Sequence, residues 1–187
     1  MSGLVYKFEG RSAVHLAAAL NFVDFINIFV KHELNIDLPN FFGERPIIQA
    51  IRMGHLQAAK ALINAGAGVK SETPGVTNPS QFYPSPLYIA IELDSQQNNF
   101  PIVYQLIFGG AISDLLKEYH FHPFFIAICK GSEFYIKLLL KRGIDVNLRD
   151  AYHKKALHLA SEKGNSRIVT LLYEMSCFKQ RYYVITV

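Results

Sequence analysis

The chain has 187 residues, half of them hydrophobic, and a formal net charge of +4. This length suits one cooperative array rather than two domains. The uncharged windows 73–91 and 95–113 are broken by Pro, Gly, Asn and Gln, so no membrane span is expected, and the start lacks the charged-then-apolar pattern of a signal peptide.

One phrase recurs along the chain, each time as a turn, a small-residue helix and a Leu/Ile-rich second helix. Its anchor residues stand at 13, 46, 86, 123 and 156, so the spacings are 33, 40, 37 and 33 residues. We expect repeats at about 7–39, 40–72, 80–116, 117–149 and 150–177 in a single domain at 7–178, followed by a tail or cap at 179–187. Such a period indicates a stacked array, because one helix pair cannot bury its own apolar face.

Local signals support helices in each copy. Ser12 and Ser85 stand where N-caps belong, and Pro46 occupies a first helical position, where the missing N–H costs no hydrogen bond. Gly66, Gly110 and Gly143 follow second helices, where a left-handed C-cap is needed. The first copy departs from this pattern, with Asn21 and Glu33 in place of glycines, and Phe22 and Phe25 make it unusually apolar for a terminal repeat.

The second copy reads Asn40-Phe-Phe-Gly43-Glu-Arg-Pro46-Ile-Ile-Gln-Ala50 and continues to Leu62-Ile63-Asn-Ala-Gly66-Ala67. It resembles the ankyrin repeat, whose pattern runs D-x-x-G-x-T-P-L-H-x-A-A-x-x-G-H and then V-x-x-L-L-x-x-G-A. The resemblance covers about residues 7–176 and implies an all-α fold, an ankyrin-repeat solenoid of stacked helix-turn-helix units with projecting β-turn fingers. The histidine of the pattern is kept at His15 and His158, while the inner copies carry apolar or aromatic residues that are expected to fill the core.

The third copy is longer than the others. Seven extra residues fall within 71–85, which predicts an extended finger, and four more are expected to lengthen the turn between its two helices, from Asp94 to Pro101. Added length in a repeat array maps to loops and is often functional, although drift in a tolerant loop explains it equally well.

The resemblance implies that a partner lies along the concave face made by the finger tips and the exposed side of each first helix. With Pro46 as position seven, position three is aromatic in four copies, and exposed rings on turns favour binding, unless they fold back onto neighbouring turns. The expected partner-binding residues are Phe41, Phe42, Arg52, Met53, Phe82, Leu93, Tyr119, Phe121, Lys130, Tyr152 and Lys163.

Catalytic and metal sites are not expected. His120 and His122 share a turn and His153 lies one repeat further along, but neighbouring helix pairs are about 10 Å apart, too far for one ion. Cys129 lacks an orienting third group, and no phosphate loop or metalloprotease motif is present. The sequence therefore predicts no enzyme activity, no metal and no cofactor.

The expected function is binding of a protein partner, as an adaptor, an inhibitor or a host-targeting effector that is monomeric when alone. Two cysteines without framework spacing favour a reducing compartment, the cytoplasm or, for a secreted effector, the host cytosol. One alternative is a scaffold module of a larger enzyme or channel. A weaker one is nucleic-acid binding, because residues 141–187 hold nine Lys/Arg against four Asp/Glu.

Overall fold

The computed structural model describes residues 10–69, 84–97, 99–111, 122–150 and 152–185. These residues form ten α-helices and one isolated β-bridge between Arg149 and Lys155, and none of them belongs to a strand. The all-α fold expected from the sequence is confirmed. None of the described helices has the length and apolar character needed to cross a membrane.

The chain divides into two compact units, Met1–Asp114 and Leu115–Val187. Unit 1 contains three helix pairs: α1 (Ala13–Ala19) with α2 (Val23–Lys31), α3 (Pro46–Arg52) with α4 (Leu56–Asn64), and α5 (Pro86–Gln97) with α6 (Phe100–Phe108). Unit 2 contains two pairs: α7 (Pro123–Cys129) with α8 (Glu133–Lys141), and α9 (Ala156–Glu162) with α10 (Ser166–Ile185). Each pair corresponds to one repeat of the sequence, and we number the repeats 1 to 5.

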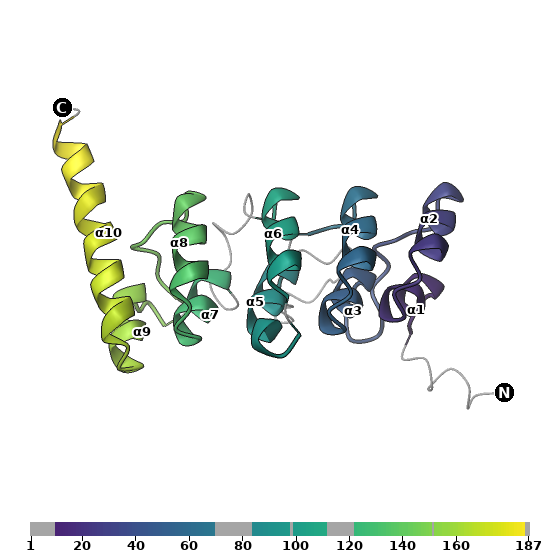
Figure 1. The fold of residues 1–187 in the computed structure, drawn as a ribbon, viewed down its shortest axis with the longest axis horizontal. Helices are drawn as coiled ribbons and strands as arrows, with labels where there is room; N and C mark the ends of the chain where they lie inside the picture. The colour runs from purple at the N-terminus through teal and green to yellow at the C-terminus, as the bar shows by residue number, and fades with distance from the viewer. Residues whose placement is uncertain (1–9, 70–83, 98, 112–121, 151, 186–187) are drawn as a thin grey trace. The chain divides into compact units, whose positions relative to one another are not determined.

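Within unit 1 the first helices form one layer and the second helices another. Helix α3 contacts both α1 and α5, and α4 contacts both α2 and α6 (Figure 1). Ala17, Ala50 and Ala90 are buried in the first helices, where a small side chain permits close approach. In unit 2, α7 contacts α8 and α9, and α9 contacts α10.

The turns after the helices require left-handed backbone. Gly54 (φ 69°) and Gly66 (φ 86°) provide it in repeat 2, and Asn21 (φ 57°) and Glu33 (φ 56°) hold the same conformation in repeat 1. Asn tolerates this region better than most residues, and the Asn21 side chain also accepts a hydrogen bond from the Ala58 N–H at 3.1 Å. Repeat 1 is therefore tied to repeat 2 through a position that is usually glycine.

The extra residues between the two helices of repeat 3 extend a helix, which corrects the expectation of a longer turn at 94–101. The extended finger expected within 71–85 lies outside the described residues up to residue 83. Helix α5 has 12 residues, whereas α3 has seven, and α6 begins at Phe100. No Gly or Pro interrupts the chain between Pro86 and Asn99, so nothing local stops the helix.

The last helix is also longer than expected. The sequence placed a tail or cap after residue 178, but α10 has 20 residues and ends at Ile185. The chain from Ser166 to Val187 has no Gly or Pro, and Gly143 shows how such a residue ends the equivalent helix α8.

Candidate partner-binding site

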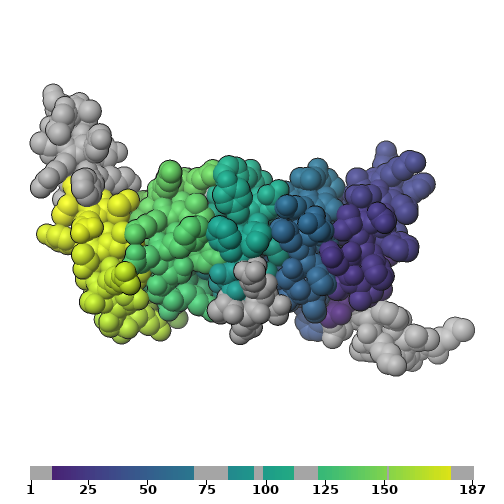
Figure 2. Space-filling view, viewed as in Figure 1, coloured from purple at the N-terminus to yellow at the C-terminus, as the bar shows by residue number. Residues whose placement is uncertain are grey.

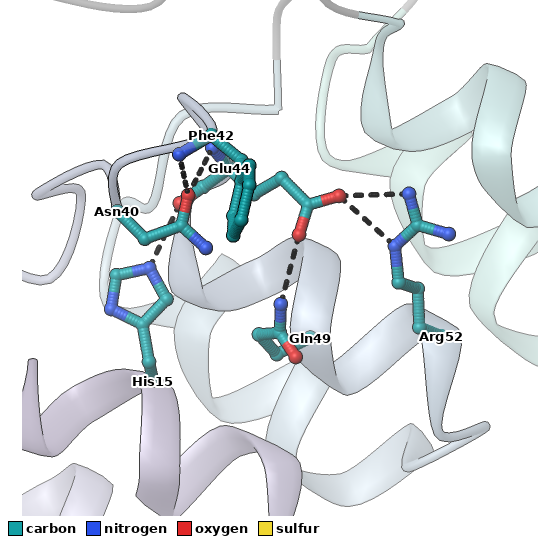
Figure 3. Close-up of polar contacts among 6 residues, drawn as sticks. All are labelled: His15, Asn40, Phe42, Glu44, Gln49 and Arg52. Atoms are coloured by element: carbon teal, nitrogen blue, oxygen red, sulfur yellow. Dashed lines mark hydrogen bonds and ion pairs between the residues drawn. The ribbon is translucent and has the colours of Figure 1, made fainter. Parts of the chain in front are cut away.

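The turn before α3, residues 40–45, is here called finger 2. Its backbone is held by Asn40, whose Oδ1 accepts hydrogen bonds from the N–H groups of Phe42 and Glu44, both at 2.9 Å (Figure 3). The Asn40 N–H donates to the Glu44 carbonyl at 2.9 Å, and Gly43 turns the chain with φ 73°. The buried Asn40 side chain thus fixes the finger and leaves the Phe42 ring to project from it.

Finger 2 is joined to repeat 1 and to the end of α3. His15 of α1 lies with Nε2 2.8 Å from the Glu44 carbonyl. The Glu44 carboxylate accepts hydrogen bonds from Arg52 Nη2 at 2.8 Å and Nε at 3.1 Å, and from Gln49 Nε2 at 3.0 Å (Figure 3). Arg52 is therefore held beside the finger while its side chain stays 43% exposed.

The turn before α9 is finger 5, described at residues 150 and 152–155, and it has the same construction in unit 2. The Asp150 carboxylate accepts hydrogen bonds from the N–H groups of Tyr152 at 2.9 Å and Lys154 at 2.8 Å. His153 (φ 60°) adopts the left-handed backbone that Gly43 adopts in finger 2. The Tyr152 ring projects at the position of Phe42.

The two fingers carry the same ion pair with opposite polarity. In repeat 2 the acidic residue, Glu44, is on the finger and the basic residue, Arg52, is on the helix. In repeat 5, Lys154 is on the finger and pairs with Glu162 of α9 at 2.6 Å. The hydrogen bond to Glu162 raises the pKa of Lys154. Each pair ties a finger to its first helix, but the two fingers present different charges.

The expected aromatic anchors are exposed where the structure describes them. The side chain of Phe42 is 56% exposed and that of Tyr152 is 81% exposed. Phe41 is also exposed, and its ring lies against Gly10, where an added Cβ would be 2.6 Å from Cδ1. Phe82, Tyr119 and Phe121 lie outside the described residues.

The other expected residues lie at or near the C-terminal ends of first helices. Arg52 and Met53 are exposed at the end of α3, close to finger 2, and Leu93 is half-buried in α5. Lys130 and Lys163 are the exposed C-cap residues of α7 and α9. The structure thus groups Phe42 with Arg52 in unit 1, through Glu44, and Tyr152 with Glu162 and Lys163 in unit 2, through Lys154.

Sequence reasoning missed the polar residues that build the fingers. Asn40 and Asp150 hold the turns, and the pairs at positions five and 13 tie each finger to a helix. A signal was available, because both pairs have opposite charges separated by eight residues in the same repeat register. His153 is an exposed turn residue, and among the described residues no group of three or more His, Cys, Asp or Glu side chains could hold a metal ion.

His15 is a buried titratable group at the base of this site. Its Nε2 must carry the proton, since the Glu44 carbonyl can only accept, and its Nδ1 accepts from the Ser12 N–H at 3.1 Å. Burial lowers the pKa of His15 below its ordinary value of 6.5, with Arg11 adding to the shift and the hydrogen bond to Glu44 opposing it. The folded protein therefore holds the neutral imidazole.

We expect the array to lose stability as the pH falls below 6.5. Below that pH, His15 of the unfolded chain binds a proton that His15 of the folded protein does not. The stability that His15 contributes is therefore fully present above its pKa in the unfolded chain and is lost as the pH falls towards its pKa in the folded protein. Urea unfolding should give a lower free energy of unfolding at pH 5.5 than at pH 7.5, with His15 contributing up to about 1.4 kcal/mol of the difference. His15→Ile, which introduces the residue type of the buried Ile48 of repeat 2, should be less stable at pH 7.5 but less sensitive to pH. Equal pH sensitivity of the two proteins would contradict this assignment.

Comparison with known proteins agrees with the repeat structure. A family model described as ankyrin repeats (three copies) matches residues 2–73 and 87–182. The ankyrin repeat protein FPV244 of Fowlpox virus (strain NVSL) is 50% identical over 36 residues, 19% of this chain and 5% of that protein. Ankyrin repeat and SOCS box protein 11 of Mus musculus is 30% identical over 129 residues, 69% of this chain and 36% of that protein. The aligned segments thus span only a small part of one relative and about a third of the other, and the family match covers most of the chain. The chain belongs to the ankyrin repeat family.

Proposed function

We propose that this chain binds a protein partner through its fingers and the adjoining ends of its first helices, with Phe42 and Tyr152 as anchors. Ankyrin repeats are generally protein–protein interaction modules. The observation that carries the proposal is an exposed aromatic ring on each of two turns whose backbone is already fixed by a side-chain carbonyl or carboxylate.

The physical argument rests on preorganisation. A partner that docks on finger 2 does not have to order the turn, because Asn40 and Glu44 already hold it, so little conformational entropy is lost on binding. Exposed Tyr and Phe side chains supply large apolar area, and residues of this kind dominate the energetics of many interfaces. Arg52 beside Phe42, and Lys163 beside Glu162, would add charged contacts at the rim.

The biological setting is part of the proposal. Adaptor, inhibitor and host-targeting effector all use such a surface in the same stoichiometric way. Both cysteines of the chain are free thiols, which favours a reducing compartment such as the cytoplasm. Because the aligned relatives are much longer than the segment they share with this chain, the array can also serve as the binding module of a larger protein.

A capture experiment tests the site with a matched control. Wild-type protein, Phe42→Ala/Tyr152→Ala and Phe134→Ala/Tyr173→Ala are used as baits in cell lysate, and retained proteins are identified by mass spectrometry. Phe134 and Tyr173 are exposed rings on the second helices α8 and α10, so the control removes the same residue types from another surface. We expect a partner that is retained by wild type and by the control but lost by the finger variant.

The partner is then purified and its affinity is measured by calorimetry. Loss of an anchor ring should weaken binding by about 2 kcal/mol or more, roughly 30-fold, while the control stays within about threefold. Thermal melts must match among the three baits. Equal retention by all three, or equal loss from both variants, would reject the finger site.

A further inference from the structure

One end of unit 1 presents an apolar surface that the finger site does not use. Helices α1 and α2 form this end, shown in purple in Figures 1 and 2. Five large apolar side chains of repeat 1 are exposed there, and together they are called the end face: Leu16, Phe22, Phe25, Ile28 and Leu34. They come from α1, from α2, from the residue before α2 and from the segment that follows α2.

In the other repeats of unit 1, most of the positions equivalent to the end face are covered by a neighbouring repeat. Phe25 is 53% exposed, whereas the residues at its position in repeats 2 and 3, Ala58 and Ile102, are 0% and 1% exposed. Leu16 and Leu34 follow the same rule, because the residues that occupy their positions in repeats 2 and 3 are all buried: Gln49, Ala67, Ile89 and Ala111. These positions are covered when another helix pair precedes the repeat, as α1 and α2 precede α3 and α4.

Hydrogen bonds confirm which way this side of a repeat faces. His55 and Asn99 occupy the position of Phe22 in repeats 2 and 3. The His55 Nε2 lies 3.1 Å from the carbonyl of Ala19, and the Asn99 Nδ2 donates to the carbonyl of Ile51 at 3.3 Å. In both cases the side chain reaches the end of the first helix of the preceding repeat. The end face of repeat 1 therefore has the geometry of a surface that receives helices.

We propose that a second copy of this chain covers the end face, giving a symmetric dimer in which α2 packs antiparallel against α2 of the other copy. A two-fold axis close to Ile28 brings the apolar residues of the two end faces together. It also places Asp24, in the first turn of α2, beside Lys31 of the second copy, in the last turn. Both side chains are exposed, and neither makes an ion pair with another described residue. The acidic first turn of α2 in one copy therefore pairs with the basic last turn of α2 in the other.

The size of the end face is consistent with a dimer. Five half-exposed apolar side chains offer on the order of 500 Å² per copy, at the upper end of the patches found on monomers. A standard interface buries about 800 Å² per partner, and the exposed polar residues His32, Glu33 and Asn35 beside the end face can supply a rim. The sequence alone predicts a monomer, whereas this proposal is a dimer.

Sedimentation equilibrium of the full chain, from about 1 to about 200 μM, brackets the affinities of interfaces of this size. Wild type should approach twice its mass of 21.1 kDa as the concentration rises, and Phe25→Glu should remain at 21.1 kDa. Phe134→Glu is the matched control, since it places the same charge on an exposed phenylalanine of α8, and it should dimerise as wild type does. Thermal melts confirm that each variant is folded.

A charge exchange distinguishes this dimer from other modes of association. Asp24→Lys should weaken the dimer about tenfold, because each copy then faces Lys31 of the other with a like charge, and the contact occurs twice. Adding Lys31→Asp in the same chain should restore it, since the pair is re-formed with reversed polarity.

The proposal is overturned if wild type stays at 21.1 kDa at the highest concentration, if its mass grows without limit, or if Phe25→Glu dimerises like wild type. Failure of the double charge exchange to restore the dimer overturns the antiparallel arrangement. The result is independent of the finger site, because Phe42→Ala/Tyr152→Ala should dimerise normally whether or not it binds a partner.

Discussion

Replacing Leu62 in unit 1 or Leu139 in unit 2 by alanine should lower the free energy of unfolding of the unit that contains it by about 2–5 kcal/mol. The two residues occupy the same repeat position, in α4 and α8, and both are fully buried. Each truncation removes apolar contacts and leaves a cavity that the surrounding helices fill only in part. Leu157→Ala, at an exposed position of α9, should cost less than about 1 kcal/mol.

The same pair of variants tests whether the chain unfolds as one cooperative array. The sequence predicts one cooperative array, and in such an array damage in either unit should shift a single transition measured by circular dichroism in urea. Both variants should give one transition with an unchanged slope and a lower midpoint. Two transitions, with Leu62→Ala moving one and Leu139→Ala moving the other, would show that the units unfold separately.

Replacing Gly68 by alanine should destabilise the array by about 1–3 kcal/mol. A Cβ at this position would overlap Nη1 of Arg45, a buried side chain that cannot swing into solvent without leaving Asp37. Burial lowers the pKa of Arg45 and the charge of Asp37 raises it, so the carboxylate partly offsets the cost of burying the guanidinium. Asp37 also accepts the Gly68 N–H, at 3.0 and 2.8 Å, and thereby ties repeat 1 to the loop after α4.

The control for this prediction is Gly66→Asn. Gly66 has a left-handed backbone (φ 86°) and no heavy atom within 4 Å of an added Cβ, and asparagine tolerates that conformation, so the cost should stay below about 1 kcal/mol. Differential scanning calorimetry of both variants measures the difference. A Gly68→Ala protein that melts with wild type would show that Arg45 moves aside at no cost.

Much of the fold follows from local signals in the sequence. Two of these signals are Pro at the start of first helices and Gly after second helices, repeated at the spacing of the five copies. They act within a few residues, so they specify the helix pairs without help from tertiary contacts. Ser85 shows such a signal at work, since its Oγ accepts from the Tyr88 N–H at 3.1 Å. The same local logic also explains the two errors at helix ends, because extra residues without Gly or Pro lengthened α5 and α10 instead of forming loops.

The candidate site was predicted only in part. Position in the repeat placed Phe42 and Tyr152 on fingers, but periodicity does not say whether a ring on a turn points into solvent or onto its neighbour. That depends on Asn40 and Asp150, which fix the turns, and on Glu44 and Lys154, which anchor them to the helices. Whether these side chains meet depends on the three-dimensional path of the turn, which the repeat spacing does not specify.

The sequence by itself determined the repeat, the helices and the ankyrin family, because these depend on residue types at short, fixed spacings. Only the tertiary structure decided which faces are covered. Phe25 and Ala58 occupy the same repeat position, yet one is half exposed and the other is buried, since among the described residues only Ala58 has a preceding helix pair to pack against. Whether a side chain is buried depends on whether another repeat packs against it, and no local sequence pattern specifies that.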